Sequence, residues 1–190
     1  MATCHPVRYV TISLSMPERP PDNSEFNVEP SVEGFFIPAD IGDPIERTSV
    51  PLNDYRARQE LVGGLFTVLD FIEPPATLYC GDEAILQGRA PNARASLLLS
   101  MHNFVHRNYT VIFGDGFLVG PADDDGNDTP VPEELTRMLT DPAPKVVGAK
   151  VDGNWVTRGK LYPSWIDAYS SALRLARAIP DIQDVRVTFA

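Results

Sequence analysis

Residues 59–107 read QELVGGLFTVLDFIEPPATLYCGDEAILQGRAPNARASLLLSMHNFVHR and hold the clearest hydrophobic periodicity of the 190-residue chain. A helix is predicted to end at Gly63, because glycine adopts the left-handed conformation that follows many helices. Residues 65–72 and 77–80 are rich in branched and aromatic side chains, which indicates two strands. Asn92 then caps a predicted helix over 93–106, whose buried stripe would be Leu97, Leu98, Met101, Phe104 and Val105.

The segment before this stretch is less regular. Residues 7–15 alternate apolar and polar side chains, which is typical of a half-buried strand. Residues 16–33 are rich in proline and predict a surface loop. Short strands are expected at 34–38 and near 45–50, and Asn53 is expected to cap the helix that ends at Gly63.

The segment after this stretch contains a glycine-rich connection. Residues 109–113 and 117–120 are apolar and are separated by Gly114-Asp115-Gly116, which predicts a β-hairpin. An acidic loop over 121–130 follows. A helix over 132–140 is then expected, because proline and glutamate are favoured in a first helical turn.

The last 47 residues have the pattern of a separate small unit. Two strands joined by Asp152-Gly153, a helix over 164–178 and a strand over 184–189 predict a ββαβ unit. A unit this small needs support, so residues 144–190 should pack on an acidic domain formed by residues 1–143. The predicted fold class is therefore α+β: a mixed β-sheet with two or three helices packed on it, followed by this unit.

Composition restricts the classes of protein that fit. The chain has a net charge of −10, which argues against bulk attraction to nucleic acid or to an anionic membrane. Residues 145–190 nevertheless carry seven basic and four acidic residues, a net of +3, so the remainder carries −13. We expect no membrane span and a cytoplasmic location, because no apolar window is long enough and no signal peptide is evident. The two cysteines, Cys4 and Cys80, are expected to be free thiols.

A metal site could be built on His102 and His106, which are four residues apart in the helix predicted over 93–106. Position 103 is asparagine, so the glutamate of a metalloprotease motif is absent from HNFVH. The alternative is two surface or cap histidines, and we favour it.

The acidic residues form a second candidate site. They are Asp123, Asp124, Asp125, Asp128, Glu133 and Glu134. In the register of an EF-hand, Gly126 at position six would place prolines at the two ends of the loop, where acidic residues are required. An irregular divalent-ion site stays open beside the simpler interpretation as a solvated acidic surface.

Nucleic-acid binding is the third candidate activity, and it would use the basic C-terminal unit. Basic and aromatic side chains are interleaved there, as is typical of surfaces that bind single strands: Trp155, Arg158, Lys160, Arg174 and Arg177. The alternative is that Trp155 and Trp165 form the core of the unit. No catalytic nucleophile motif, Walker loop or dinucleotide fingerprint is present, so no cofactor is expected.

Several turn and cap motifs give a family resemblance over about residues 55–135. They are Val62-Gly63-Gly64, Asp82-Glu83, Asn92 with Ala95, and Gly114-Asp115. With these motifs the chain resembles DUF3846-type proteins, which are small proteins of unknown function from phages and actinobacterial genomes. The resemblance implies a phage or mobile-element accessory protein with no established catalytic residues.

The leading hypothesis is a non-enzymatic phage or mobile-element accessory protein that binds a host macromolecule, for which we expect a host protein. One version of it is a nucleic-acid mimic, whose carboxylates would occupy a host DNA-binding or defence protein. The alternatives are a nucleic-acid-binding module that uses the C-terminal unit and a metal-dependent enzyme that uses the two histidines.

Overall fold

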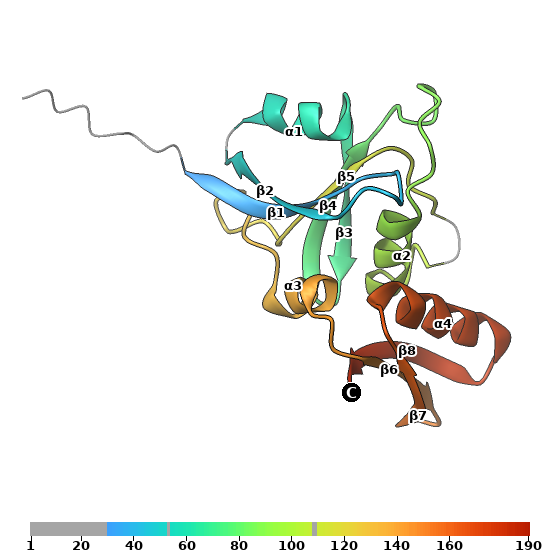
Figure 1. Ribbon diagram of the computed structural model, residues 1–190. Helices are drawn as coiled ribbons and strands as arrows, with labels where there is room; N and C mark the ends of the chain where they lie inside the picture. The colour runs from blue at the N-terminus through green and yellow to red at the C-terminus, as the bar shows by residue number, and fades with distance from the viewer. Residues whose placement is uncertain (1–29, 53, 108–109) are drawn as a thin grey trace, which may run out of the picture.

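A computed structural model describes residues 30–52, 54–107 and 110–190, except for the side chain of Arg158. Two antiparallel sheets lie at opposite ends of the molecule, with helices between them (Figure 1). The strand predicted over 7–15 and most of the loop over 16–33 lie outside the described residues. Asn53 does so too, and its predicted role as the helix cap was wrong, because Asp54 is the cap.

The larger sheet has five strands in the order β2-β1-β5-β4-β3. Every pair of neighbouring strands is antiparallel, whereas we predicted a mixed sheet. The predicted α+β class is confirmed. Its strands are β1 (Ser31–Ile37), β2 (Glu46–Pro51), β3 (Phe66–Ile72), β4 (Pro75–Gly81) and β5 (Gly116–Val119).

The hairpin predicted over 109–120 does not form, because strand β5 pairs with other strands. It pairs with β1 and with β4, so that Leu118 lies between Phe35 and Leu78. Among the described residues of 110–113, only Phe113 makes a β-bridge, and its partner is Pro91. All four residues of β5 are buried, and this two-sided burial at the centre of the sheet outweighs the local turn signal.

Two helices cover opposite faces of this sheet. Helix α1 (Tyr55–Val62) begins at Asp54, whose carboxylate accepts the N–H groups of Arg56 and Ala57, and ends at Gly63 with φ of 79° as predicted. Helix α2 (Ala93–His102) begins at Asn92, as predicted.

Helix α2 ends four residues earlier than the sequence suggested. The side chain of Asn103 donates to the Asp70 carbonyl and accepts the N–H of Val105, which fixes the backbone outside the helix. Phe104 and Val105 are 67% and 62% exposed, so their assignment to the buried stripe was wrong. Leu98 and Met101 of that stripe are buried as expected.

The predicted ββαβ unit is confirmed. It consists of β6 (Lys145–Val151), β7 (Asn154–Tyr162), α4 (Trp165–Ala178) and β8 (Ile182–Phe189). The strand order is β7-β6-β8, so β7 and β8 are the edge strands. Asp152 and Gly153 both have positive φ in the tight turn between β6 and β7, as the Asp-Gly pair predicts.

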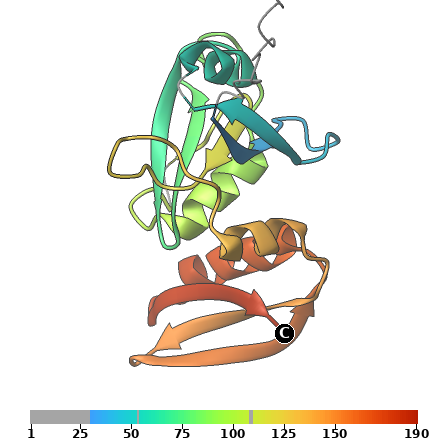
Figure 2. The same ribbon diagram turned by 90° about the vertical axis from the view of Figure 1, so that its left-hand side faces the viewer.

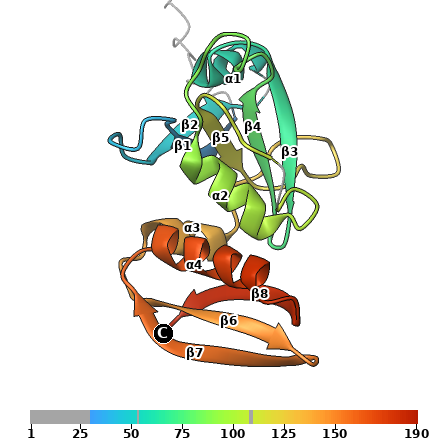
Figure 3. The same cartoon turned by 90° about the vertical axis from the view of Figure 1, so that its right-hand side faces the viewer.

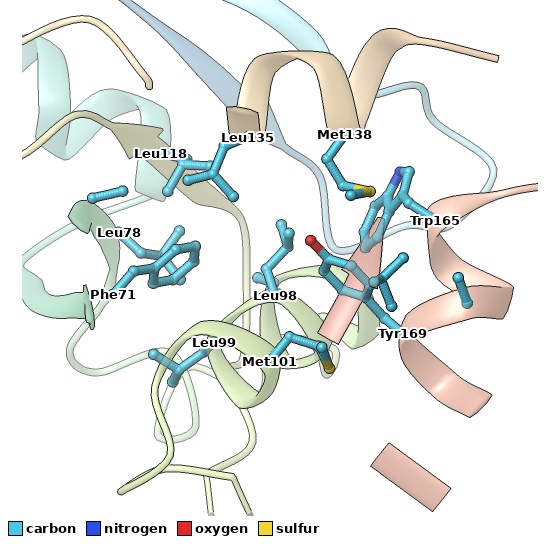
Figure 4. Close-up of a cluster of buried hydrophobic side chains, with 14 of the residues drawn as sticks. Phe71, Leu78, Leu98, Leu99, Met101, Leu118, Leu135, Met138, Trp165 and Tyr169 are labelled. Carbon is cyan, nitrogen blue, oxygen red and sulfur yellow. The ribbon is translucent and has the colours of Figure 1, made fainter. Parts of the chain in front are cut away.

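The two sheets share one hydrophobic core. Helix α4 and helix α3 (Glu133–Thr140) lie between the sheets, and α2 packs on α4 from the other side (Figures 2 and 3). Leu98 from α2, Leu135 and Met138 from α3, and Trp165 and Tyr169 from α4 converge in this core (Figure 4). Burial of these side chains therefore stabilises the contact between the two halves.

Candidate functional site

A groove of about 770 Å³ lies where the two halves meet. Its walls are the turn between β3 and β4, the end of α2, α3 and Tyr169 of α4. Its floor is β8, from which the six consecutive residues 183–188 line the groove. In Figure 2 the β3–β4 turn lies above β8, with α3 beside it.

His102 lies at the back of this groove and is half-buried. Its Nδ1 is 2.8 Å from the Glu73 carbonyl, and its Nε2 is 2.7 Å from the Tyr169 hydroxyl. The carbonyl can only accept, so Nδ1 carries the proton and Nε2 accepts the hydroxyl hydrogen. Burial lowers the pKa of His102, although the hydrogen bond to Glu73 opposes this effect.

The two histidines do not form the metal pair that their spacing allows. Both ring nitrogens of His102 are bonded to protein groups, and Nδ1 of His106 is 2.8 Å from the Thr110 hydroxyl. His106 follows the end of α2 and so loses the helical spacing. In the described ranges, no cluster of three or more histidine, cysteine or acidic side chains is arranged to hold a metal ion.

The half-buried imidazole of His102 should make the stability of the protein depend on pH. In the unfolded chain His102 should titrate at its ordinary pKa of about 6.5, whereas the folded pKa is lower. The unfolded state therefore binds more protons below that pH, and stability falls as the pH falls through this range. We expect the melting temperature to drop between about pH 7.5 and pH 5.5, and to drop less for His102→Gln. Equal slopes for the two proteins would contradict this account.

The rim of the groove combines exposed apolar and charged side chains. Ile72 is 47% exposed and Phe104 is 67% exposed at the upper rim. Arg107 pairs with Asp184 of β8 at 3.3 Å. Cationic and aromatic groups meet on the lower side, where the Arg186 guanidinium lies 4.2 Å from the centre of the Trp155 ring. An extended ligand with both apolar and charged groups would fit this combination.

The acidic residues are divided among different environments. Asp123, Asp124 and Asp125 are exposed in the turn of the 121–130 loop, and Glu133 and Glu134 are exposed in the first turn of α3. Asp123 accepts the backbone N–H groups of Asn127 and Asp125, and the bond from Asn127 is the main reason its pKa is lowered. Glu134 alone of these residues lines the groove.

Asp128 does not belong to an acidic surface, because it is only 8% exposed. Its carboxylate accepts two hydrogen bonds from Arg58, at 3.0 and 2.6 Å, and one from the Tyr79 hydroxyl at 2.7 Å. Burial and this hydrogen bond raise the pKa of Tyr79 to about 12. Asp128 therefore connects the acidic loop to α1 and β4.

The five residues proposed for nucleic-acid binding do not share one surface. Trp155 is 37% exposed and Lys160 is exposed, both on β7. Arg174 and Arg177 are exposed on α4, which packs on the other face of the small sheet. Arg158 also belongs to β7. Trp165 is core, as the alternative interpretation expected, whereas Trp155 is not.

Several groove residues carried no signal in the sequence. They are Glu73, Arg107, Tyr169, Asp184 and Arg186. They come from four separate parts of the chain, since only Asp184 and Arg186 share a strand, β8, and the packing of the two halves brings these parts together. The one available hint was the basic character of residues 145–190, to which Arg186 contributes.

The fold and the groove define a small α+β protein with two antiparallel sheets and a cleft between them. The chain belongs to the family described as a domain of unknown function, DUF3846, whose model matches residues 35–143. The matched span extends beyond the 55–135 expected from the motifs and ends before β6. No curated protein and no solved structure matches the chain. In the described part of the chain, no helix combines the length and the apolar character needed to cross a membrane.

Proposed function

We propose that the chain is a non-enzymatic accessory protein of a phage or mobile element, and that it binds a host protein in the host cytoplasm. The groove between the two sheets is its recognition site. The observation that carries the proposal is the exposed apolar rim, Ile72 and Phe104, above a floor formed by a strand edge. Apolar anchors beside a concave surface are typical of protein recognition sites.

The chemistry inside the groove also supports binding over catalysis. Both nitrogens of His102 are bonded to protein groups, and burial raises the pKa of Tyr169, so that its hydroxyl stays protonated. The carboxylate of Asp184 is paired with Arg107. These groups therefore stabilise one another, and the exposed apolar and cationic groups are left to contact a ligand.

The test is affinity capture from a lysate of the host cells with the groove blocked. We expect Phe104→Glu to abolish capture of the partner, because it places a carboxylate on the apolar rim. Leu86→Glu is the matched control, since Leu86 is 87% exposed but lies outside the groove. Equal capture by the two variants, measured by mass spectrometry, would remove the groove as the recognition site.

A nucleic-acid mimic would require one continuous face of carboxylates. The exposed carboxylates instead lie on separate segments, including Asp40 and Asp43 between β1 and β2, Asp82 and Glu83 after β4, and the 121–130 loop. The β1–β2 loop and the 121–130 loop lie at opposite sides of the molecule in Figure 1. We therefore place recognition in the groove and not on an acidic face.

Nucleic-acid binding is the second candidate, and the exposure of Trp155 beside Arg186 favours it. A base could stack on the indole ring while the guanidinium contacts a phosphate. A gel shift with single-stranded dT15 is the direct check. This alternative requires a shift at low salt that Trp155→Ala removes and Arg174→Ala leaves unchanged, and it fails if dT15 does not shift.

A further inference from the structure

Among the described residues, strand β8 pairs along one edge only, and we call the other its free edge. It is the last strand of the small sheet, and its other edge pairs with β6 from Lys145↔Phe189 to Lys150↔Asp184. The Ala190 N–H donates to the Pro144 carbonyl at 3.0 Å, which fixes the alternation of the ladder. The N–H and C=O groups of Val185, Val187 and Phe189 therefore point away from β6.

The free edge of β8 faces the groove. Six consecutive residues of the strand line the groove, so side chains of both faces and the edge between them are accessible from it. The Val185 N–H donates to a local acceptor, the Asp184 carboxylate, at 2.8 Å, as expected of a donor that points away from β6. A strand edge with outward backbone groups is a template for a further strand.

Strand β7 forms the opposite edge of the small sheet, and it is better protected against strand addition than β8 is. The β6–β7 register shifts between Val146 and Gly148, and β7 carries Gly159 and the exposed Lys160. An irregular register and edge lysines are devices that prevent strand addition. Strand β8 keeps a regular register over the six pairs from Lys145 to Lys150 of β6, and its own register shift, between Lys150 and Val151, lies at the start of the strand.

We propose that an extended segment of the partner protein adds to the edge of β8 and carries alternating apolar and acidic side chains. This inference rests on the proposed function and specifies how the partner is recognised. The segment would lie between β8 and the rim formed by the β3–β4 turn and the end of α2.

The two faces of β8 determine why apolar and acidic side chains should alternate in the added segment. Residues opposite Val185 and Val187 would place their side chains toward the apolar wall formed by Leu135, Met138 and Tyr169. The intervening side chains would lie on the opposite face, beside Lys150 and Arg186. Within the described residues neither cation forms an ion pair, so acidic side chains would complement them.

A second copy of the chain fits this edge less well. Pairing of β8 with another β8 would bring the two Arg186 side chains close together, and like charges across a strand pair are destabilising. The groove volume of about 770 Å³ is also in the range of ~300–1,000 Å³ that holds a small ligand, and a short peptide suits it better than a folded domain does.

The test measures fluorescence anisotropy of labelled eight-residue peptides with the full chain. We expect a peptide of alternating valine and glutamate to bind, and one of alternating valine and lysine to bind at least about fivefold more weakly. Lys150→Glu should narrow or reverse this preference. Equal affinity for the two peptides would overturn the acidic part of the proposal, and no binding of either would overturn the whole.

Backbone methylation separates strand addition from other modes of binding. Residues opposite Val185 and Val187 would form the hydrogen bonds to β8, so N-methylation of the two central valines should weaken binding about tenfold. N-methylation of the two central glutamates is the control and should leave the affinity unchanged. Equal tolerance of both modifications would overturn strand addition while leaving the groove as a binding site.

Two further outcomes identify other occupants. If dT15 displaces the valine–glutamate peptide and binds more tightly, the surface recognises nucleic acid and the proposal is overturned. If sedimentation shows a dimer that the peptide dissociates, the natural occupant of the edge is a second copy. Loss of lysate capture in Phe104→Glu without any peptide binding would retain the proposed function and reject this mode of recognition.

Discussion

Replacing Asp128 with asparagine should lower the free energy of unfolding by about 3–5 kcal/mol. The side chains of Arg58 and Asp128 are 8% and 5% exposed, and their atoms approach to 2.6 Å. Asparagine has the same shape but no charge, so the guanidinium of Arg58 would stay buried without its counter-ion. Arg58 also donates to the Leu52 and Asp54 carbonyls, which fix it in place.

Thermal and urea unfolding of the full chain measure this effect. For a chain of this size, the expected loss corresponds to a decrease in melting temperature of about 10 °C. Asp124→Asn is the matched control, because Asp124 belongs to the same loop and is exposed. A loss of less than about 1 kcal/mol for Asp128→Asn would mean that the ion pair contributes no more than a surface pair does.

Replacing Tyr169 with alanine should destabilise the protein by about 3–5 kcal/mol, because it removes a large buried side chain from the shared core. Tyr169 is 1% exposed, contacts Trp165 edge-to-face at 5.5 Å between ring centres, and bonds to His102. Tyr169→Phe should cost about 1–3 kcal/mol, since Nε2 of His102 then loses its donor.

The same variants test whether the two sheets unfold together. One shared core predicts a single transition in calorimetry, shifted as a whole by Tyr169→Ala. Leu161→Ala is the control, because Leu161 is 57% exposed on the edge strand β7 and its loss should cost little. Two separate transitions, of which the variant shifts only one, would show that the halves unfold independently.

Local signals predicted much of the fold. Gly63, Asn92 and the Asp152-Gly153 turn have the conformations that their residue types favour, and α4 buries the face that its periodicity indicated. In each of these cases the deciding interaction lies within a few residues of the chain.

Long-range interactions explain the errors. The helix predicted through His106 ends at His102 because Asn103 bonds to Asp70 of a distant strand. The hairpin predicted over 109–120 does not form because β5 pairs with β1 and β4, which lie far away in the sequence. Asp128 could not be distinguished from its exposed acidic neighbours, since its partners Arg58 and Tyr79 belong to other elements.

The groove could not be predicted for the same reason. Phe104 appeared to continue a helical stripe and is instead an exposed rim residue. Arg186 and Trp155 meet only because β6 lies between their strands. The sequence predicted that residues 144–190 pack on the rest of the chain, but it did not predict the surface that this packing creates.

The most direct measurement of the central claim is an NMR titration of the ¹⁵N-labelled chain with the alternating valine–glutamate peptide. If the groove is the recognition site, the largest amide shifts should occur at Val187, Arg186 and Phe104, while Leu86 and Asp124 stay unchanged. Shifts confined to β7 or to the 121–130 loop, or no shifts at saturating peptide, would contradict it.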